Sequence, residues 1–447
     1  MTFPIHDASP VRFPGPLPAE ADVVIIGGGV VGVMTAWFLA ERGLRVTLCE
    51  KGRIAGEQSS RNWGWVRQQG RDPGELPIMV ESLRLWKSLA QELGQGLGFR
   101  QTGVLYLADT AEEMAGYEGW LTHARTHDVD SRILSRDEVA AMIPQAAAGW
   151  KGGLWTASDA RAEPWAAVPL LAEGAVRRGV TIVENCAVRA LDIAAGRVAG
   201  VVTERGRIRA GRVLVAAGAW SRLFLGAHGV KIPQLAVLAS VAATAPLPLV
   251  FDGAACDSRF AFRRRADGGY SIAPSDHHDF FPGRDAFASL RSFLPVLRQD
   301  FRTTRFRPFA PKGYPDAWGT PRRWSPDEVS PFERMRILNP APNAAVVERL
   351  RDDFARTFPA LGRPELTAAW AGMIDTMPDV VPVVDHIAAI PGLTVATGMS
   401  GHGFGIGPGM GRVVASLVAG DAPGHDLSRF RFSRFSDGTK LAPGPSL

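Results

Sequence analysis

The sequence contains few cysteines. Its 447 residues include only three, Cys49, Cys186 and Cys256, and they lie far apart along the chain. This number and spacing exclude a disulfide framework and a thiol metal site, and no redox-active thiol pair is expected. So few thiols are typical of a protein of the reducing cytoplasm, which is the predicted location.

The chain also lacks a recognisable targeting or membrane-spanning segment. Residues 1–18 contain five prolines and have neither a basic start nor an apolar core, so they predict no signal peptide, and 1–20 is expected to be a flexible arm. The uncharged stretch 23–40 is long enough to imitate a membrane span, but four glycines interrupt it. It is therefore predicted to form a strand, a turn and a helix.

No strong charge of one sign is present. Fifty lysines and arginines against 45 acidic residues leave a net charge of +5, which is too small for so long a chain to indicate a nucleic acid partner. The densest basic run, Arg263 to Arg265, precedes a predicted hairpin turn and is expected to be solvated. The neighbours His277 and His278 would point to opposite sides of a strand, so they predict no metal site.

What the chain does contain is a complete strand, glycine-rich turn and helix near its start. The apolar run 21–26 is typical of a buried parallel strand and leads into Gly27, Gly29 and Gly32, spaced as G-x-G-x-x-G. The first glycine permits a tight turn, the second admits a pyrophosphate close to the backbone, and the third lets the helix pack on the strand. The helix N-terminus then attracts the phosphate.

A second apolar strand, 44–49, follows this helix and ends at Glu50. A carboxylate at this place suits hydrogen bonds to the ribose hydroxyls of an adenosine and disfavours a 2′-phosphate. The whole unit therefore predicts FAD or NAD as the ligand rather than NADP.

Four further segments, 56–64, 213–221, 370–382 and 397–404, extend the pattern. With the first unit they resemble the FAD-dependent oxidoreductases of the D-amino acid oxidase superfamily, which includes glycine oxidase, sarcosine oxidase and D-amino acid dehydrogenase. In that family the corresponding segments are a loop around the pyrophosphate, a strand and turn beside the adenosine, a W-x-G…P-D-x-x-P block and a flavin-capping turn. The resemblance implies FAD as the cofactor.

The resemblance also implies that FAD is held without a covalent bond, because the cysteine that binds flavin in sarcosine oxidase has no counterpart at Gly372 or Met373. The motif and the resemblance together assign the following residues to FAD: Gly27, Gly29, Val30, Val31, Gly32, Glu50, Lys51, Ser59, Ser60, Arg61, Asn62, Trp63, Gly64, Val188, Ala217, Gly218, Trp220, Gly372, Gly401, His402, Gly403, Phe404 and Gly405.

An apolar helix is predicted over 411–418, with Pro408 near its start and the glycine-rich turn leading into it. Its N-terminus would stabilise negative charge on a reduced flavin. The turn nearly spells the G-x-S-x-G nucleophile elbow of a serine hydrolase. However, His402 replaces the last glycine and no second triad member is evident, so a hydrolase is not expected.

The family's architecture implies an α/β fold, with a Rossmann-type FAD-binding domain and an α+β substrate-binding domain built on an antiparallel sheet, as in the glutathione-reductase-2 and p-hydroxybenzoate-hydroxylase-like proteins. The FAD-binding domain is assigned to 21–75, 151–225 and 365–425, the substrate-binding domain to 76–150 and 226–364, and a C-terminal tail to 426–447. Predicted elements of the substrate-binding domain are strands at 259–265 and 269–273 and helices at 78–93 and 345–358.

The substrate side departs from the family. Glycine oxidase and D-amino acid oxidase relatives carry a carboxylate-binding arginine in the 370–382 block, where this chain has Ile374 and Asp375. Either Arg67 or Arg61 replaces that arginine, since a guanidinium binds a carboxylate bidentately, or the substrate has no carboxylate there. For Arg67 an ion pair within the protein remains an alternative.

Three more side chains have two interpretations each. Asp375 is expected either to hold a substrate ammonium group and help remove its proton or to hydrogen-bond the turn backbone before Met377 and Pro378. Trp63, with Trp65, either forms a pocket wall or belongs to the core. His402 is expected to support the flavin turn rather than to act as a base.

The preferred interpretation is FAD-dependent oxidation of an amine or amino acid, in which a hydride passes from the carbon next to nitrogen to flavin N5 and the resulting imine hydrolyses. The candidate catalytic residues are Asp375, His402, Arg67 and Trp63. The oxidant is oxygen or another electron acceptor, and the lysine that activates oxygen in sarcosine oxidase has no clear counterpart, which favours a dehydrogenase.

Two alternatives stay open. One is a 2-hydroxy acid dehydrogenase, which would need His402 as its base. The other is a subunit that carries FAD to relay electrons within a hetero-oligomer. Both a homo-oligomer and a hetero-oligomer are compatible with the sequence.

Overall fold

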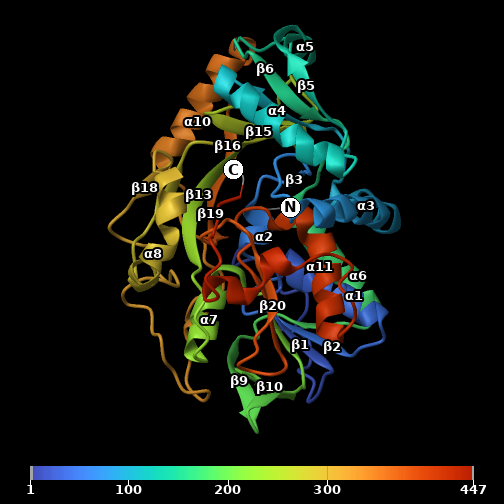
Figure 1. Cartoon of the computed structure of the whole chain (residues 1–447), viewed down its shortest axis with the longest axis vertical. Helices are drawn as coiled ribbons and strands as arrows, with labels where there is room; N and C mark the ends of the chain where they lie inside the picture. Colours follow the sequence, from blue (N-terminus) through green and yellow to red (C-terminus); the bar gives the residue numbers. More distant parts are fainter. Residues whose placement is uncertain (1–3, 148, 300, 445–447) are drawn as a thin grey trace.

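The computed structural model describes residues 4–147, 149–299 and 301–444. The first three residues of the expected arm and the last three of the expected tail lie outside this described part. Two sheets dominate the fold, a six-stranded sheet in the lower half of Figure 1 and a ten-stranded sheet above it. Among the described helices, none is both long and apolar enough to cross a bilayer.

The six-stranded sheet contains the predicted strand, turn and helix unit. Its order is β20-β21-β12-β1-β2-β8, and all neighbours pair in parallel except β20 and β21. Strands β1 and β2 are buried at every position, as parallel strands covered on both faces must be. The strands are β1 (Val23–Ile26), β2 (Val46–Cys49), β8 (Thr181–Val183), β12 (Val213–Val215), β20 (Val383–His386) and β21 (Leu393–Thr397).

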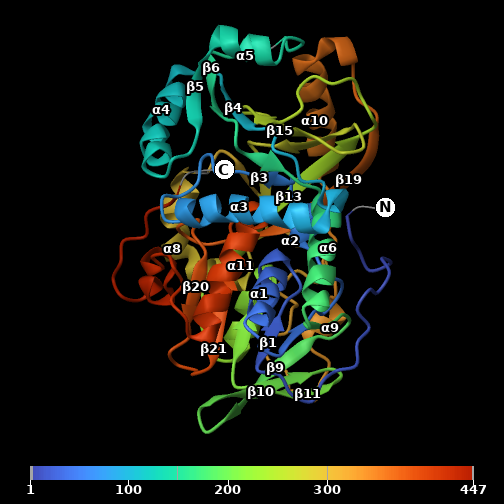
Figure 2. The ribbon, with the colours of Figure 1, turned by 90° about the vertical axis from the view of Figure 1, so that its right-hand side faces the viewer.

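Alternate residues of β1 enter different hydrophobic cores. Val23 and Ile25 pack beneath the helices, whereas Val24 and Ile26 pack beneath a small antiparallel sheet on the other face. That small sheet consists of β9 (Val188–Ala194), β10 (Arg197–Thr203) and β11 (Gly206–Arg209). The helices that cover the first face are α1 (Val30–Glu41), α3 (Leu76–Leu93), α6 (Pro164–Arg177) and α11 (Gly403–Ala419), all visible in Figure 2.

Glycines set the close spacing of α1 and α11. A Cβ atom on Gly407 would lie 2.5 Å from Val30, and one on Gly411 would lie 2.4 Å from Met34. The helix predicted over 411–418 is longer in the structure and begins eight residues earlier, at Gly403. Glycine is a poor helix former, but here it permits a helix–helix approach that no larger residue allows.

The ten-stranded sheet is mainly antiparallel, and its order is β18-β17-β13-β16-β15-β14-β4-β6-β5, with β19 also paired to β13. Only β4 with β14 and β17 with β18 pair in parallel. Its strands are β4 (Val104–Ala108), β5 (Ser131–Ser135), β6 (Gly152–Thr156), β13 (Leu235–Thr244), β14 (Ala254–Cys256), β15 (Phe260–Arg264), β16 (Tyr270–Pro274), β17 (His278–Phe280), β18 (Thr304–Phe306) and β19 (Leu366–Thr376). Both β6 and β19 come from segments assigned to the FAD-binding domain, yet they pair in this sheet.

Helices cover the outer side of this sheet. Phe354 of α10 (Ala344–Thr357) is fully buried and contacts the rings of Phe260 and Tyr270. The predicted strands 259–265 and 269–273 and the helix 345–358 agree with β15, β16 and α10 to within one residue at each end, whereas the predicted helix 78–93 is α3, which covers the six-stranded sheet. The remaining helices are α2 (Gln58–Arg61), α4 (Ala111–Thr126), α5 (Arg136–Met142), α7 (Ser221–Ala227), α8 (Arg284–Gln299) and α9 (Pro331–Arg334), and β3 (Trp65–Val66) pairs with β7 (Ala160–Arg161).

The prediction that the basic run Arg263 to Arg265 is solvated is wrong for two of its three arginines. Arg263 and Arg265 are buried, and only Arg264 is partly exposed. Arg263 forms a bidentate ion pair with Glu163, at 2.9 and 3.1 Å, and donates to the backbone oxygen of Trp63. A buried guanidinium is tolerated because its charge is paired.

One contact was not predicted, and one further expectation is corrected. Cys49 and Cys186, far apart in sequence, are both buried and close enough for their side chains to hydrogen-bond, which with burial raises the pKa of Cys49. The described part of the expected flexible arm is packed, since Arg53 donates to the Ser9 oxygen and Arg61 to the Ile5 oxygen, at 2.8 and 3.0 Å.

Candidate active site

A cavity of about 1060 Å³ is lined by residues of both large sheets. Its volume exceeds the roughly 300–1,000 Å³ of ordinary small-molecule sites, so it has room for a cofactor together with a substrate. All the predicted site residues line it except Gly32, Ser60 and Gly64. The structure therefore brings together segments from both ends of the chain, as the predicted site requires.

The glycine-rich turn lies at one end of this cavity. Gly27 has a φ of 113°, and a Cβ there would lie 2.4 Å from the Ala216 oxygen. A Cβ on Gly32 would lie 2.1 Å from the Gly27 oxygen, so Gly32 acts through packing instead of facing the cavity. The turn delivers the N-terminus of α1 to the cavity wall, where unpaired backbone N–H groups favour a phosphate.

Glu50 lies at the end of β2, beside this turn. Its carboxylate accepts hydrogen bonds from the backbone N–H groups of Gly28 and Gly52, at 2.8 and 2.7 Å. Desolvation nevertheless raises the pKa of Glu50. The two bonds fix the carboxylate at the cavity wall, where it can accept further hydrogen bonds from ribose hydroxyls.

A polar cluster follows in the loop 56–64, which the resemblance assigns to the pyrophosphate and which is called the pyrophosphate loop below. Lys51 pairs with Glu57 at 2.7 Å and lies 4.3 Å from the centre of the Trp220 ring, whose Nε1 also donates to Glu57. Glu57 was not predicted as a site residue, although its place in the Ser- and Gly-rich loop could have indicated it. The cluster neutralises the lysine, so Lys51 is not a free cation of the cavity.

Arg61 is occupied by structural contacts. Its guanidinium donates to the backbone oxygens of Ala371 and Ile5, each at 3.0 Å, and to Asn339 Oδ1 at 2.7 Å. Burial lowers the pKa of Arg61 to about 10. These contacts tie the pyrophosphate loop to β19 and leave Arg61 poorly suited to bind a substrate carboxylate.

Asp375 is buried on β19 and holds the turn that follows β21. Its Oδ2 accepts hydrogen bonds from Gln234 Nε2 at 2.9 Å and from the Gly398 backbone N–H at 2.8 Å, with Thr397 Oγ1 at 3.4 Å. Desolvation raises the pKa of Asp375 in spite of these donors. The carboxylate thus supports the backbone at Gly398, whereas among the described residues it makes no hydrogen bond to the turn before Met377 and Pro378 for which the sequence offered it.

His402 lines the cavity and belongs to a buried charged cluster. Its Nδ1 lies 3.3 Å from Glu75 Oε2, which also pairs with Arg71 at 3.3 Å, and Arg71 donates to the His402 backbone oxygen. Both ring nitrogens of His402 lack a hydrogen-bond partner among the described residues. Burial lowers the pKa of His402 to about 4, which makes the ring neutral at pH 7.

Arg67 differs from Arg61 and Arg71. It lines the cavity, its side chain donates to the Gln69 backbone oxygen, and its guanidinium lies 5.7 Å from the centre of the Tyr106 ring. No carboxylate lies within ion-pair distance of Arg67 in the part of the chain that the structure describes. Trp63 and Trp65, in an edge-to-face contact at 5.5 Å, and Tyr106 line the same cavity.

These features fit FAD. The glycine turn leaves a cradle that any side chain would fill, and Glu50 supplies an acceptor for a ribose. The N-termini of α1 and α11 both reach the cavity, where they favour the negative charge of a pyrophosphate or a reduced ring.

The comparisons with known proteins agree with this geometry. Sarcosine oxidase subunit beta of Rhizobium meliloti (strain 1021) is 27% identical over 434 residues, which cover 96% of this chain and 91% of that protein. Glycine oxidase of Pseudomonas aeruginosa is 27% identical over 414 residues, covering 90% and 95%. The solved structure of L-amino acid deaminase from Proteus myxofaciens in complex with anthranilate matches with a TM-score of 0.91, 30% identity and 97% coverage of both chains.

The predicted fold class and the predicted cofactor, FAD, are confirmed by these relationships. The family described as FAD dependent oxidoreductase (DAO) matches residues 22–417, which is most of the chain. The chain therefore belongs to this family of FAD-dependent oxidoreductases.

Proposed function

We propose that this protein oxidises the C–N bond of a small amine or amino acid, and that an amino acid with a free carboxylate is the preferred substrate. The oxidant that reoxidises the protein is oxygen or another electron acceptor. The sarcosine, glycine and L-amino acid enzymes to which the chain is similar support this reaction class.

Arg67 carries the proposal. Its side chain is 7% exposed, it lines the cavity, and no described carboxylate pairs with it. Leaving a guanidinium desolvated without a counter-ion is costly, so this part of the cavity favours an anionic ligand. The planar fork of arginine binds a carboxylate through two parallel hydrogen bonds, which also orients the ligand.

The neighbouring groups suit the rest of an amino acid. Trp63, Trp65 and Tyr106 offer aromatic surface to an apolar or cationic group. His402, neutral at pH 7 and with both ring nitrogens lacking a hydrogen-bond partner among the described residues, can hydrogen-bond the amino group of the substrate. FAD, when bound, supplies the hydride acceptor.

The cofactor-binding residues support the same proposal. Glu50 would hold the ribose of the adenosine, the N-terminus of α1 the pyrophosphate, and the N-terminus of α11 the flavin end. We assign the six-stranded sheet with its helices to FAD binding and the ten-stranded sheet to substrate binding. The cytoplasm suits this chain, because its three cysteines are free thiols.

The test is the visible spectrum of the purified protein under anaerobic conditions. An oxidised flavin band that bleaches when amino acids, N-methyl amino acids or amines are added supports the proposal. Bleaching by 2-hydroxy acids alone would replace it with the hydroxy acid reaction, for which neutral His402 would be the base. A band that bleaches with none of these compounds until a second chain is supplied would indicate an electron-relay subunit.

A further inference from the structure

The segment that carries Arg67 is held by a carboxylate that lies outside the cavity. Asp159, between β6 and β7, is 0% exposed, and its Oδ1 and Oδ2 accept hydrogen bonds from the backbone N–H groups of Gln68 and Gln69, at 2.6 and 3.2 Å. The Gln68 side chain donates a third bond, at 3.3 Å. In the part of the chain that the structure describes, no cation lies within ion-pair distance of Asp159. A buried carboxylate without a paired cation is costly, and all three donors that offset this cost belong to the segment after Arg67.

Asp159 continues the pairing of two short strands. In the antiparallel pair of β3 and β7, Trp65 is opposite Arg161 and Val66 is opposite Ala160, so the same register brings position 67 opposite position 159. The strand ladder ends at this point, and the two side-chain oxygens of Asp159 accept from the backbone N–H groups that follow. Buried N–H groups without an acceptor are rare, so this carboxylate determines where residues 68 and 69 lie.

The position of Gln69 in turn sets the direction of the Arg67 side chain. The Arg67 guanidinium donates to the Gln69 backbone oxygen, and Thr156 Oγ1 donates to Gln69 Oε1 at 2.7 Å. Arg67 lines the cavity, whereas Gln69 and Asp159 do not. Asp159 is therefore connected to the cavity through Arg67 and has no contact of its own with a ligand there.

We propose that Asp159 is a positioning residue of the active site, whose carboxylate fixes residues 67–69 so that the Arg67 guanidinium points into the cavity. The inference rests on the proposed function, in which Arg67 binds the carboxylate of the substrate. A guanidinium that is already oriented loses less conformational freedom when the ligand arrives, so the affinity for a carboxylate rises.

A second effect of Asp159 has the opposite sign. Burial raises the pKa of Asp159 to about 7, so at about pH 8.5 the side chain is ionised, and its negative charge interacts with the Arg67 guanidinium. If this charge were its main effect, removing it would strengthen the binding of an anion at Arg67. If positioning is its main effect, removing it weakens that binding. The sign of the change in Kd decides between the two.

Binding of benzoate to the complete FAD-loaded protein tests the inference. Benzoate has a carboxylate but no amino group, benzamide is its neutral counterpart, and a change in the visible absorption of the flavin reports binding of either. In Asp159→Asn the amide nitrogen cannot accept a hydrogen bond, so one of the two backbone N–H groups loses its partner. The variant should raise the Kd of benzoate at least tenfold at about pH 8.5 and leave that of benzamide within about twofold.

A second variant weakens the same segment without changing a charge. Thr156 is 0% exposed, and Thr156→Val keeps its shape but removes the hydrogen bond to Gln69. It should raise the Kd of benzoate about threefold. Asp353→Asn is the matched control, because Asp353 is also a buried carboxylate, 3% exposed on α10, and does not line the cavity. It should leave the Kd of benzoate unchanged even where it lowers stability.

The Arg67→Met background separates positioning from a general structural role. Without the guanidinium there is nothing for Asp159 to position, so adding Asp159→Asn to Arg67→Met should change the Kd of benzoate no further. An equal effect of Asp159→Asn in both backgrounds, or equal weakening of benzoate and benzamide, would overturn the inference and make Asp159 purely structural.

The remaining outcomes are also decisive. Tighter binding of benzoate by Asp159→Asn would overturn the inference, because Asp159 would then act as a competing negative charge. Where that variant fails to fold, an unchanged Kd of benzoate in Thr156→Val would overturn it instead. If the wild-type protein does not prefer benzoate to benzamide, or if Arg67→Met keeps that preference, the proposed role of Arg67 itself is wrong.

Discussion

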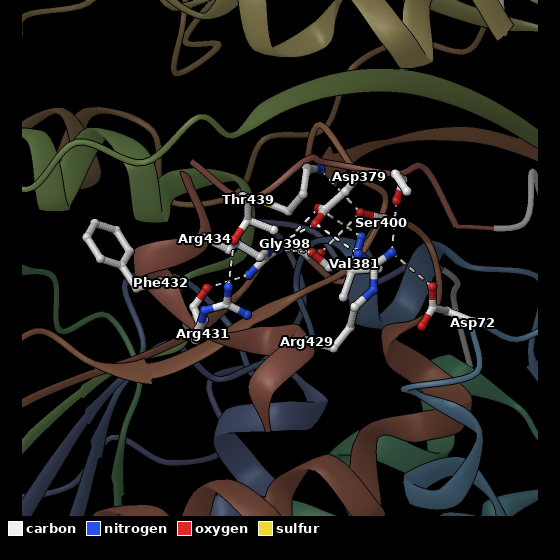
Figure 3. A network of polar contacts seen from close by, with 12 residues as sticks. Asp72, Asp379, Val381, Gly398, Ser400, Arg429, Arg431, Phe432, Arg434 and Thr439 are labelled. Atoms are coloured by element: carbon white, nitrogen blue, oxygen red, sulfur yellow. Dashed lines mark hydrogen bonds and ion pairs between the residues drawn. The ribbon is translucent and has the colours of Figure 1, made fainter. Parts of the chain in front are cut away.

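Arg434 of the C-terminal tail and Asp379, in the loop between β19 and β20, form a bidentate ion pair with almost no access to solvent. The two nitrogen–oxygen distances are 2.8 and 3.1 Å, and the two residues are 2% and 0% exposed. Arg434 also donates to the Val381 backbone oxygen at 2.7 Å, and Arg429 links the tail to Asp72 at 3.1 Å (Figure 3). The described part of the tail, 426–444, therefore belongs to the folded structure.

Substitution of Arg434 by methionine should be strongly destabilising, because it leaves the buried Asp379 carboxylate with only the distant contacts of Arg429 at 3.9 Å and the Val381 backbone N–H at 3.4 Å. The expected loss in free energy of unfolding is about 3–5 kcal/mol, measured by urea unfolding of the FAD-loaded protein. Arg431→Gln is the matched control in the same tail. Its ion pair with Asp437 is partly exposed, so its loss should stay below about 1 kcal/mol. Equal effects of the two variants would contradict this account.

A strained residue, Val380, lies between Asp379 and Val381, both of which Arg434 contacts. Val380 has a φ of 60°, which is unusual for a β-branched residue, and it lines the cavity. Val380→Gly should be more stable than Val380→Ala by about 1 kcal/mol, since glycine adopts this backbone without strain. At the next residue, Val381, glycine should instead be less stable than alanine. Thermal unfolding of the four variants makes the comparison, and the same order at both sites would argue against strain at Val380.

Arg67→Met tests the role given to the unpaired guanidinium. Loss of charge-assisted hydrogen bonds to a carboxylate should raise KM for amino acids roughly ten- to a hundredfold. The corresponding amino acid amides, which have no carboxylate, provide the control and should lose much less. A loss of equal size for acids and amides would remove the carboxylate contact from the site. Steady-state kinetics with the substrate identified from flavin bleaching provides both values.

The pKa of His402, lowered to about 4 by burial, predicts a pH dependence of stability. Between about pH 6.5 and pH 4 the unfolded chain binds a proton at this residue and the folded chain does not, so stability falls as the pH falls through this window. The expected contribution is about 3 kcal/mol. His402→Gln should reduce this slope in unfolding curves measured across the window.

His228 is a matched control, because burial also lowers its pKa to about 4 and it does not line the cavity. His228→Gln should reduce the slope as well, but it should leave amine-dependent flavin reduction unchanged. If the His402 variant left the slope intact, burial would not lower the pKa of this ring in the folded protein.

Asp375→Asn distinguishes the two interpretations of this carboxylate. The amide offers one acceptor to the donors of Gln234 and Gly398 and adds two donors of its own, so the variant should lose about 1–3 kcal/mol of stability. Its rate of flavin reduction by amines, followed by stopped-flow absorbance, should stay close to that of the wild type. A rate lowered a hundredfold or more would restore Asp375 as the partner of the substrate ammonium group.

Local signals were sufficient to predict the elements around the glycine turn. β1, α1 and β2 appear where apolar runs, glycine spacing and the carboxylate at Glu50 indicated them, because these signals act between near neighbours. The start of α11 was not predicted, because its glycines have a low helix propensity. In the structure the packing of these glycines against α1 outweighs that propensity.

The errors have a shared cause, which is contact between residues distant in sequence. The burial of Arg263 depends on Glu163, a hundred residues earlier, and the Cys49–Cys186 contact depends on how β2 and β8 pair. The role of Arg434 likewise appears only when the tail returns to Asp379. Periodicity and spacing carry no information about such pairs, so the supporting contacts of the site could be found only in the structure.

The cavity has a consequence for biosynthesis. Its wall runs from Ile26 to Gly405, and the ion pair that secures the loop at Val380 needs Arg434. A ribosome exposes the chain from the N-terminus onward, so the glycine turn emerges long before the groups that complete its binding site. FAD can be captured tightly only after translation is nearly finished, and until then the apolar walls of the cavity are open to chaperones or to aggregation.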